Sequence, residues 1–182
     1  MFRHIPAAVL LLACLAAPAW AGPADRKNLQ VLNDVLKQVN TYSMFTIFDD
    51  VSASVEDGVV TLTGKVTMPY KRTEIAKRVA KVDDVRDVHN LIDVFPVSQF
   101  DDDLRYRIAR AIYSHPSFWT YATMAVPPIH IVVERGHVTL TGVVNNDVDR
   151  MLARSLASQS QAFSVKSELK TDAEAKRALE GV

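Results

Sequence analysis

The sequence has no net charge, a single cysteine and few glycines. Its 21 basic and 21 acidic side chains give a formal net charge of zero, which argues against a nucleic-acid partner. The single cysteine, Cys14, lies in an apolar N-terminal segment, so the rest of the chain has no thiol, which suits an oxidising compartment without requiring disulfides. With 6 glycines, 8 prolines and 48% hydrophobic residues among 182, the composition is that of one globular domain or two small ones.

Sequence patterns for catalysis and metal binding are missing as well. The chain has no Gly-rich phosphate loop and no Ser or Cys arrangement typical of a nucleophile. His130 and His137 share one predicted hairpin, but the expected register places them opposite Thr141 and Glu134, so they do not face each other. We therefore expect a protein without catalytic residues, metal or cofactor.

The N-terminal residues have the pattern of a targeting segment. Arg3 precedes an apolar run over residues 7–17 that is too short to span a membrane comfortably. The small-x-small sequence at 19–21 predicts cleavage after Ala21, so that residues 1–21 form a signal peptide and the mature protein is periplasmic. The alternative is a lipoprotein signal in which Cys14 is acylated, which leaves a very short apolar region.

The most informative feature is a seven-residue motif that occurs twice. Residues 58–64 read Gly-Val-Val-Thr-Leu-Thr-Gly and residues 136–142 read Gly-His-Val-Thr-Leu-Thr-Gly, 78 residues apart (136 − 58). Self-similarity at a long period indicates that one structural unit is built twice. Apolar residues and threonines alternate within each motif, which predicts a strand with one apolar face. The pairs Asp57-Gly58 and Arg135-Gly136 predict two-residue hairpin turns, because glycine accepts a positive φ.

The residues before the first motif predict a helix and a partner strand. A helix over residues 25–42 has an apolar stripe at three- and four-residue spacing, formed by Leu29, Leu32, Leu36 and Val39. A strand then alternates apolar residues with serines. The predicted turn places Val55 opposite Val60 and Ala53 opposite Leu62, so that all four side chains share one face of the hairpin.

A second helix and a third strand complete the unit. The helix begins at Pro69, and a strand over 85–94 follows by a parallel, right-handed crossover. In the second copy Asp101, Asp102 and Asp103 are expected to cap the first helix, and the last strand is expected over 163–169. The predicted fold class is α+β, with two tandem α-β-β-α-β units, each a small mixed three-stranded sheet packed against two helices. The predicted domains are 25–95 and 101–171, with a linker at 96–100 and a C-terminal tail or short helix at 172–182.

The repeated pattern resembles the BON domain family, named for a bacterial osmotically induced periplasmic protein and nodulation proteins. The residues that carry the resemblance are 57–66, the alanine-spaced helix around Ala76 and Ala80, and 85–91, together with the second motif. The chain departs from the family pattern at Asp84 and Gln161, which stand where glycine is usual, and at Ser167, where asparagine is usual. The resemblance implies a non-enzymatic envelope module that binds phospholipid or another hydrophobic ligand and supports envelope integrity under osmotic stress. The alternative is a chaperone-like scaffold that binds envelope proteins.

The aromatic connector over 114–128 is the expected binding surface. One interpretation is that it and its counterpart at 42–48 cover each other in an interdomain mini-core. The functional interpretation is an amphipathic patch at an anionic phospholipid surface or in the groove of a protein partner. Arginines on the preceding helix are expected to attract anionic headgroups, as is the basic stripe of Lys71, Arg72, Lys77, Arg78 and Lys81. The candidate surface residues are Phe118, Trp119, Tyr121, Met124, Arg105, Arg107 and Arg110.

Overall fold

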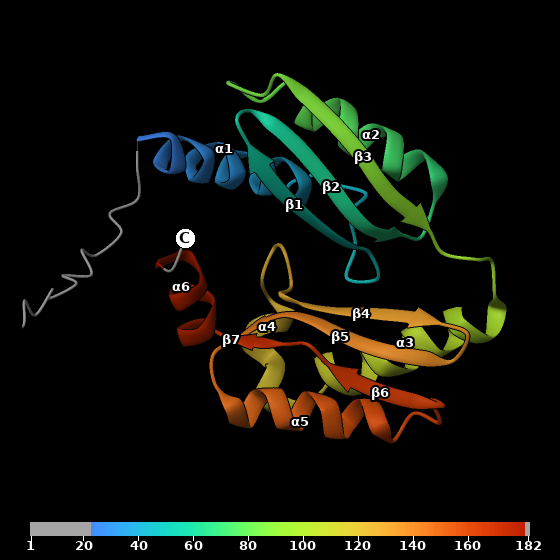
Figure 1. The fold of residues 1–182 in the computed structure, drawn as a ribbon. Helices are drawn as coiled ribbons and strands as arrows, with labels where there is room; N and C mark the ends of the chain where they lie inside the picture. The colour runs from blue at the N-terminus through green and yellow to red at the C-terminus, as the bar shows by residue number, and fades with distance from the viewer. Residues whose placement is uncertain (1–22, 181–182) are drawn as a thin grey trace, which may run out of the picture.

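A computed structural model of the protein describes residues 23–180 and shows two α+β units packed against each other (Figure 1). The predicted signal peptide and the alternative acylation of Cys14 lie outside these residues. The first unit consists of α1 (Pro23–Asn40), β1 (Asp50–Glu56), β2 (Val59–Val66), α2 (Pro69–Val79) and β3 (Asp87–Val94). The second consists of α3 (Gln99–Tyr113), the 3-10 helix η1 (Pro116–Phe118), α4 (Trp119–Ala122), β4 (Ile129–Glu134), β5 (His137–Val144), α5 (Asp147–Ser158), β6 (Ser164–Ser167), β7 (Lys170–Thr171) and α6 (Asp172–Glu180).

Each unit contains one mixed sheet, which confirms the predicted fold class, but the second sheet has four strands where three were expected. β1 and β2 form an antiparallel hairpin, and β3 lies parallel to β2. β4, β5 and β6 repeat this arrangement in the second unit. Val55 pairs with Val60 and Ala53 with Leu62, so the register predicted from the alternating pattern is confirmed.

Both hairpin turns have the left-handed backbone expected of the X-Gly pairs. The φ angles are 47° at Asp57 and 76° at Gly58, and 52° at Arg135 and 76° at Gly136. Positive φ at both central residues is typical of a type I′ turn, whose twist matches that of the flanking strands. The second turn is also held by Asp101, a buried residue of α3, whose carboxylate accepts bonds from the backbone N–H of Arg135 at 2.8 Å and of Gly136 at 2.7 Å.

The second glycine of each motif allows two backbone segments to approach closely. At Gly64, where φ is 111°, a Cβ atom would lie 2.1 Å from the carbonyl oxygen of Asp50 on the paired strand. At Gly142, where φ is 110°, it would lie 1.9 Å from the carbonyl oxygen of Pro128, just before β4. No side chain fits at either separation, so the motif requires glycine at its second end for space and not only for conformation.

Both residues that stand where the resembled family usually has glycine have left-handed backbone. Asp84 has a φ of 65° and Gln161 a φ of 66°, at equivalent positions before the last strand of each unit. Glycine adopts this conformation freely, whereas other residues pay about 1–2 kcal/mol for it. The chain therefore has the left-handed backbone at both positions, but not the glycine that adopts it most easily.

The core of the first unit corrects the predicted face of α1. The buried α1 side chains are Val31, Val35 and Val39, which pack with the apolar faces of β2, α2 and β3. Of the predicted stripe only Val39 is buried, while Leu29, Leu32 and Leu36 are half-buried. The helix has two apolar stripes, whose centres differ by roughly 90° because each residue advances the helix by about 100°. The sheet covers the valine stripe.

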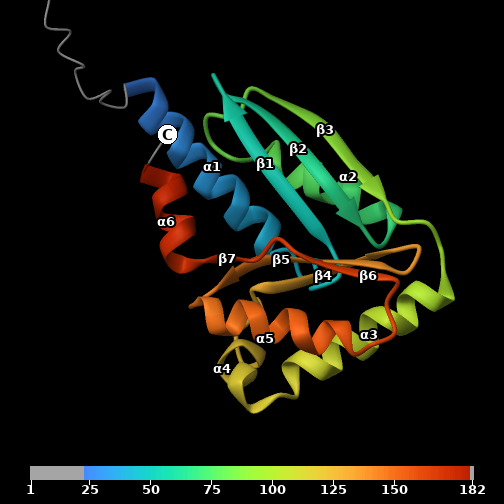
Figure 2. The same ribbon diagram turned by 60° about the horizontal axis from the view of Figure 1, so that its bottom comes forward.

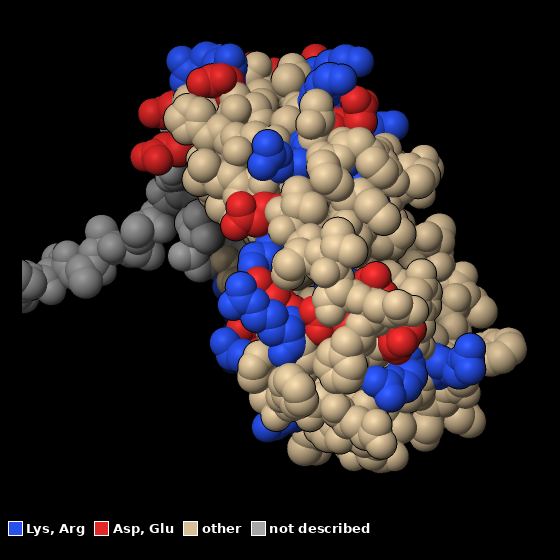
Figure 3. All heavy atoms as spheres, turned by 90° about the vertical axis from the view of Figure 1, so that its right-hand side faces the viewer, with Lys and Arg blue, Asp and Glu red and all other residues tan. Residues whose placement is uncertain are grey.

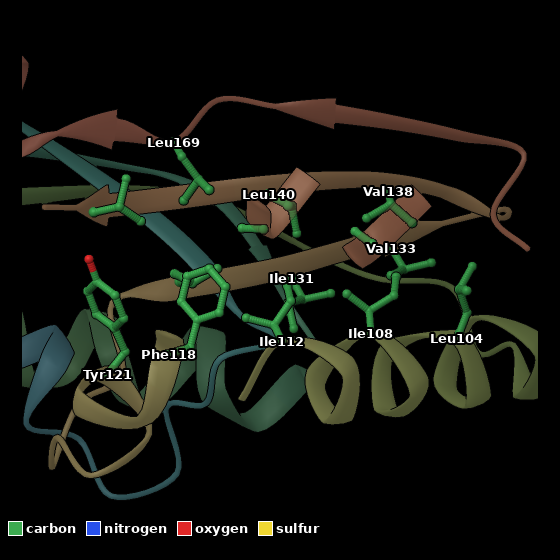
Figure 4. Packing of buried hydrophobic residues seen from close by; sticks show 14 residues of the cluster. Leu104, Ile108, Ile112, Phe118, Tyr121, Ile131, Val133, Val138, Leu140 and Leu169 are labelled. Carbon is green, nitrogen blue, oxygen red and sulfur yellow. The ribbon is translucent and has the colours of Figure 1, made fainter. Parts of the chain in front are cut away.

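The second core has the same layered form. Figure 4 shows Leu104, Ile108 and Ile112 of α3 pointing toward the strands, where Ile131, Val133, Val138 and Leu140 face them. Ala153 and Ala157 of α5, which packs beside α3 and against β5 and β6, also belong to this core. Their small side chains allow α5 to lie close to the sheet.

Two predicted boundaries in the second unit are wrong. The strand expected over 163–169 is divided into β6 and β7, both parallel to β5, because the buried side chain of Leu169 turns into the core between them. The cap of α3 is not the aspartate run: α3 begins at Gln99, and the hydroxyl of Ser98 accepts a bond from Asp101 N–H at 3.2 Å. Asp101 is free to hold the hairpin turn because the serine takes the capping role.

The first connector joins the two units along the edge of β4. The carbonyl oxygen of Ile47 accepts a bond from Ile131 N–H at 2.7 Å, and that of Asp49 lies 2.6 Å from the Nδ1 atom of His130. Phe48 meets Tyr106 edge to face, with ring centroids 5.2 Å apart. The outer edge of β4 therefore finds hydrogen-bond partners in the first unit, which protects an otherwise open strand.

Candidate functional site

The aromatic connector does not present all its aromatic residues to solvent. Phe118 is 0% exposed and Tyr121 2%, and both belong to the second core (Figure 4). Trp119 is 71% exposed and Met124 42%. Residues three apart in a helical turn lie on one face, and the intervening residue points elsewhere. The expectation of a surface role is therefore wrong for Phe118 and Tyr121, while Trp119 and Met124 are accessible.

Tyr121 has a structural role between the connector and α5. Its hydroxyl accepts a bond from Asn145 N–H at 2.8 Å and donates one to the carboxylate of Asp149 at 2.7 Å. Burial is the largest cause that raises the pKa of Tyr121 to about 12. The phenol is therefore neutral at physiological pH. Tyr113 is held similarly, because its hydroxyl donates to the carbonyl oxygen of Ile129 at 2.6 Å, and burial raises its pKa.

Arg105 is also buried and is not available to a lipid headgroup. Its guanidinium donates to the carbonyl oxygen of Val133 at 2.5 Å, pairs with Asp102 and lies over the ring of Phe95, 5.0 Å from the centroid. The side chain projects from the same face of α3 as Ile108, and this spacing explains its burial. This corrects the expectation for Arg105, which ties α3 to β4 and to Phe95 at the end of the first unit.

Arg107 and Arg110 lie on the exposed face of α3 and contribute to a shallow hollow. The hollow has a volume of about 710 Å³ and is lined by Phe100, Asp103, Tyr106, Arg107, Arg110, Ala111 and Gln161. Phe100 stacks on Phe163 at a centroid distance of 5.8 Å, and Phe163 is 72% exposed. We call Phe100, Tyr106, Arg107, Arg110 and Phe163 the α3 surface. It combines aromatic rings with two guanidinium groups beside one acidic residue, Asp103.

The α3 surface contains three aromatic residues that the connector-based prediction missed. The signal for Tyr106 is its spacing, since it falls between the buried Leu104 and Ile108 of the helical stripe. Phe100 and Phe163 come together only because the start of α3 and the residue before β6 meet beside the second hairpin turn. Their contact could not be found from helical spacing.

The helix layer of the second unit exposes further large apolar residues. Trp119 on α4, and Val148 and Met151 on α5, are all exposed. Figure 2, in which the bottom of Figure 1 comes forward, shows α3, α4 and α5 together in this layer. On the side of the molecule seen in Figure 3, basic and acidic side chains are interspersed among broad neutral areas, so no large field of one sign covers that side.

The basic stripe predicted on α2 contains one buried member. Lys71 is buried and forms an ion pair of 2.6 Å with Asp49, which is itself fully buried. The Asp49 carboxylate also accepts bonds from the backbone N–H and the hydroxyl of both Thr46 and Thr67. This network fixes the first connector to the hairpin. Burial of Lys71 corrects its expected surface role.

The mini-core interpretation holds only for part of the connectors. Ile47 and Phe48 of the first connector pack against the core of the second unit, and Tyr42 packs into that of the first. The end of the second connector, at Val126 and Pro127, borders a hollow of about 530 Å³ that Phe45 and Ile47 also line. The first connector therefore bridges the units, while most of the second packs within its own unit.

Within residues 23–180 no group of three or more His, Cys, Asp or Glu side chains could hold a metal ion. The Nδ1 atom of His137 lies 2.8 Å from the hydroxyl of Ser164, and His130 contacts the first unit as described. In the same range, no helix has both the length and the apolar character needed to cross a membrane.

Two tandem α-β-β-α-β units, each with a glycine-bounded central strand, define a duplicated α+β domain. Residues 34–96 and 101–176 each match the BON domain, and together they make up most of the chain. The protein belongs to the BON domain family. Membership supports an envelope-associated domain of a generally non-enzymatic class.

Comparison with other known proteins adds little about function. No curated protein sequence matches the chain significantly. Among solved structures, the C-terminal domain of CdsD, a structural protein of the type III secretion system of Chlamydia trachomatis, is 15% identical with a TM-score of 0.31; the match covers 78% of this chain and 65% of that one. A second CdsD structure is 14% identical with a TM-score of 0.27, covering 84% of this chain and 96% of that one. The chain thus spans just under two thirds of the first of these structures.

Proposed function

We propose that this protein is a non-enzymatic periplasmic module that binds anionic phospholipid through the helix layer of its second unit and thereby supports envelope integrity under stress. The observation that carries the proposal is the α3 surface, where exposed aromatic rings lie beside Arg107 and Arg110. Such rings suit a membrane interface, because one part is apolar and, in tyrosine, the other can hydrogen-bond. Trp119 and Met124 add accessible apolar area from the connector that follows α3.

The charge contribution can be tested with vesicles. A basic side chain near an anionic bilayer contributes about 1 kcal/mol, so the double variant Arg107→Gln and Arg110→Gln should bind about thirtyfold more weakly. Flotation of the protein with phosphatidylglycerol vesicles measures this binding. The matched control is Lys37→Gln with Arg86→Gln, two exposed basic residues of the first unit outside the basic stripe of α2, which should bind like the wild type.

The apolar contribution requires a separate variant. Tyr106→Ala should weaken flotation at high salt as well as at low salt, because screening removes the charge attraction but not the burial of the ring. Equal binding by the Arg107/Arg110 variant and its control would refute the α3 surface as the lipid site. A stoichiometric envelope-protein partner captured without vesicle binding would instead favour the chaperone-like scaffold function.

A further inference from the structure

Part of the leucine stripe of α1 lies along a groove between the two units. The first core uses the valine stripe, so Leu29 and Leu32 remain only half-buried. Both line a groove of about 580 Å³. This volume falls within the range of about 300–1,000 Å³ found for small-molecule sites. The core of the first unit covers the valine stripe of α1, and Leu29 and Leu32 of the leucine stripe stay half-buried beside the groove.

The opposite wall of the groove comes from the second unit and from α6, which follows its last strand. Ala175 and Ala178 of α6 and Val143 of β5 line the groove with the leucines, and Ala53 and Val55 of β1 complete the apolar lining. Figure 2 shows α6 beside α1, on the flank of β1. Because alanine side chains are short, the groove between α1 and α6 stays open for an extended apolar chain.

The polar groups of the groove are few, and only one of them is charged. Asn28 and Ser54 are the neutral polar residues of the lining, and Lys170 of β7 is the cation. The Lys170 side chain is exposed, and among residues 23–180 it forms no ion pair. An aliphatic slot with one unpaired ammonium group is complementary to an acyl chain that ends in an acidic group.

We propose that this groove binds a single-chain anionic amphiphile, with the acyl chain between α1 and α6 and the acidic group at Lys170. A free fatty acid and a lysophospholipid share this chemistry. The site is separate from the α3 surface, and the inference rests on the proposed function only in taking lipid as the class of ligand. The protein would thus hold a lipid monomer in one site while it contacts a bilayer through another.

The apolar part of the groove can be tested with a fatty acid whose fluorescence rises on burial. The full mature chain is titrated with cis-parinaric acid below its micelle concentration, and saturable one-to-one binding is expected. Ala178→Trp should fill the slot and abolish the saturable signal. Ala173→Trp places the same side chain at an exposed position of α6 outside the lining and should leave the titration unchanged. Thermal unfolding of both variants checks that each is folded.

The headgroup contact has its own variant and control. Lys170→Glu should weaken fatty-acid binding about tenfold or more, the scale of losing a hydrogen bond between charged groups. Lys176→Glu, an exposed lysine of α6 outside the lining, should not. Displacement of the probe by oleate and by lysophosphatidylglycerol then distinguishes a carboxylate from a phosphate ligand.

The results separate this site from the α3 surface. Absence of saturable binding, or equal effects of the two tryptophan variants, would overturn the groove proposal whatever the vesicle experiments show. A concentration-dependent dimer that Ala178→Trp abolishes, without probe binding, would assign the groove to a second copy of the chain and also overturn it. Loss of vesicle binding by the Arg107/Arg110 variant with an unchanged titration would support both sites.

Discussion

Phe118 and Trp119 are neighbours in the sequence, yet truncation to alanine should affect them in opposite ways. Phe118 is fully buried among core residues and contacts the ring of Tyr121, with centroids 5.7 Å apart. Removing a buried phenylalanine side chain costs about 3–5 kcal/mol. Trp119 is mostly exposed, and surface truncations usually change stability by less than about 0.5 kcal/mol.

The measurements are thermal unfolding and urea unfolding of both variants, each followed by far-UV circular dichroism. For a chain of this size each kcal/mol shifts the melting temperature by about 2–4 °C, so Phe118→Ala should melt roughly 6–20 °C below the wild type. Trp119→Ala should melt with the wild type. Loss of more than about 2 kcal/mol in Trp119→Ala, or less than about 1 kcal/mol in Phe118→Ala, would refute the orientation of η1 and α4.

The same pair of variants tests the proposed membrane contact. If the indole of Trp119 lies at a lipid interface, Trp119→Ala should reduce vesicle flotation while stability is retained. Trp119→Phe should recover part of the binding, because a ring is restored without the polar N–H group. Unchanged flotation by Trp119→Ala would remove this residue from the lipid-binding surface and leave the α3 surface to be tested alone.

Three further predictions concern buried or paired polar groups. Asp101→Asn should destabilise the protein by about 1–3 kcal/mol in urea unfolding, because an amide cannot accept from both turn N–H groups as the carboxylate does; wild-type stability would contradict its role. The pKa of Tyr121, raised to about 12 in the folded protein, means that folding stability falls as pH rises from about 10 to about 12, and Tyr121→Phe should make this fall shallower. The N–H of Thr171, and then Arg150, lower the pKa of Glu174, so its stabilising contribution is present above its unfolded pKa and is lost as pH falls through the folded value. Glu174→Gln should therefore be less stable than the wild type at pH 7, and the difference should disappear in acid; a difference independent of pH would contradict this.

The sequence alone predicts the strands, turns and registers because these depend on neighbouring residues. Alternation specifies which face of a strand is apolar, and the X-Gly pairs specify where the chain reverses. The pairing of Ala53 with Leu62 follows from the turn position without any distant contact. Repetition of the motif then predicts the second unit, since the same local interactions occur 77 to 78 residues later.

Helix faces are less well determined by sequence. On α1 the stripe of Leu29, Leu32 and Leu36 has the same helical spacing as the stripe that includes Val31 and Val35. Periodicity shows that each stripe forms a face, but not which face the sheet covers. The structure places the valines in the core, and Leu29 and Leu32 in a groove with α6, an element that lies at the other end of the chain.

Only the tertiary structure decides the surroundings of the charged and aromatic candidates. Arg105 and Lys71 resemble surface residues in the sequence, but each is buried because an acceptor lies beside it: the carbonyl oxygen of Val133 for Arg105 and the carboxylate of Asp49 for Lys71. Burying a charge is tolerable only with such a partner, and the partner lies more than twenty residues away in each case. The local pattern therefore determines the repeated unit, while the meeting of distant segments determines which side chains remain available to bind a ligand.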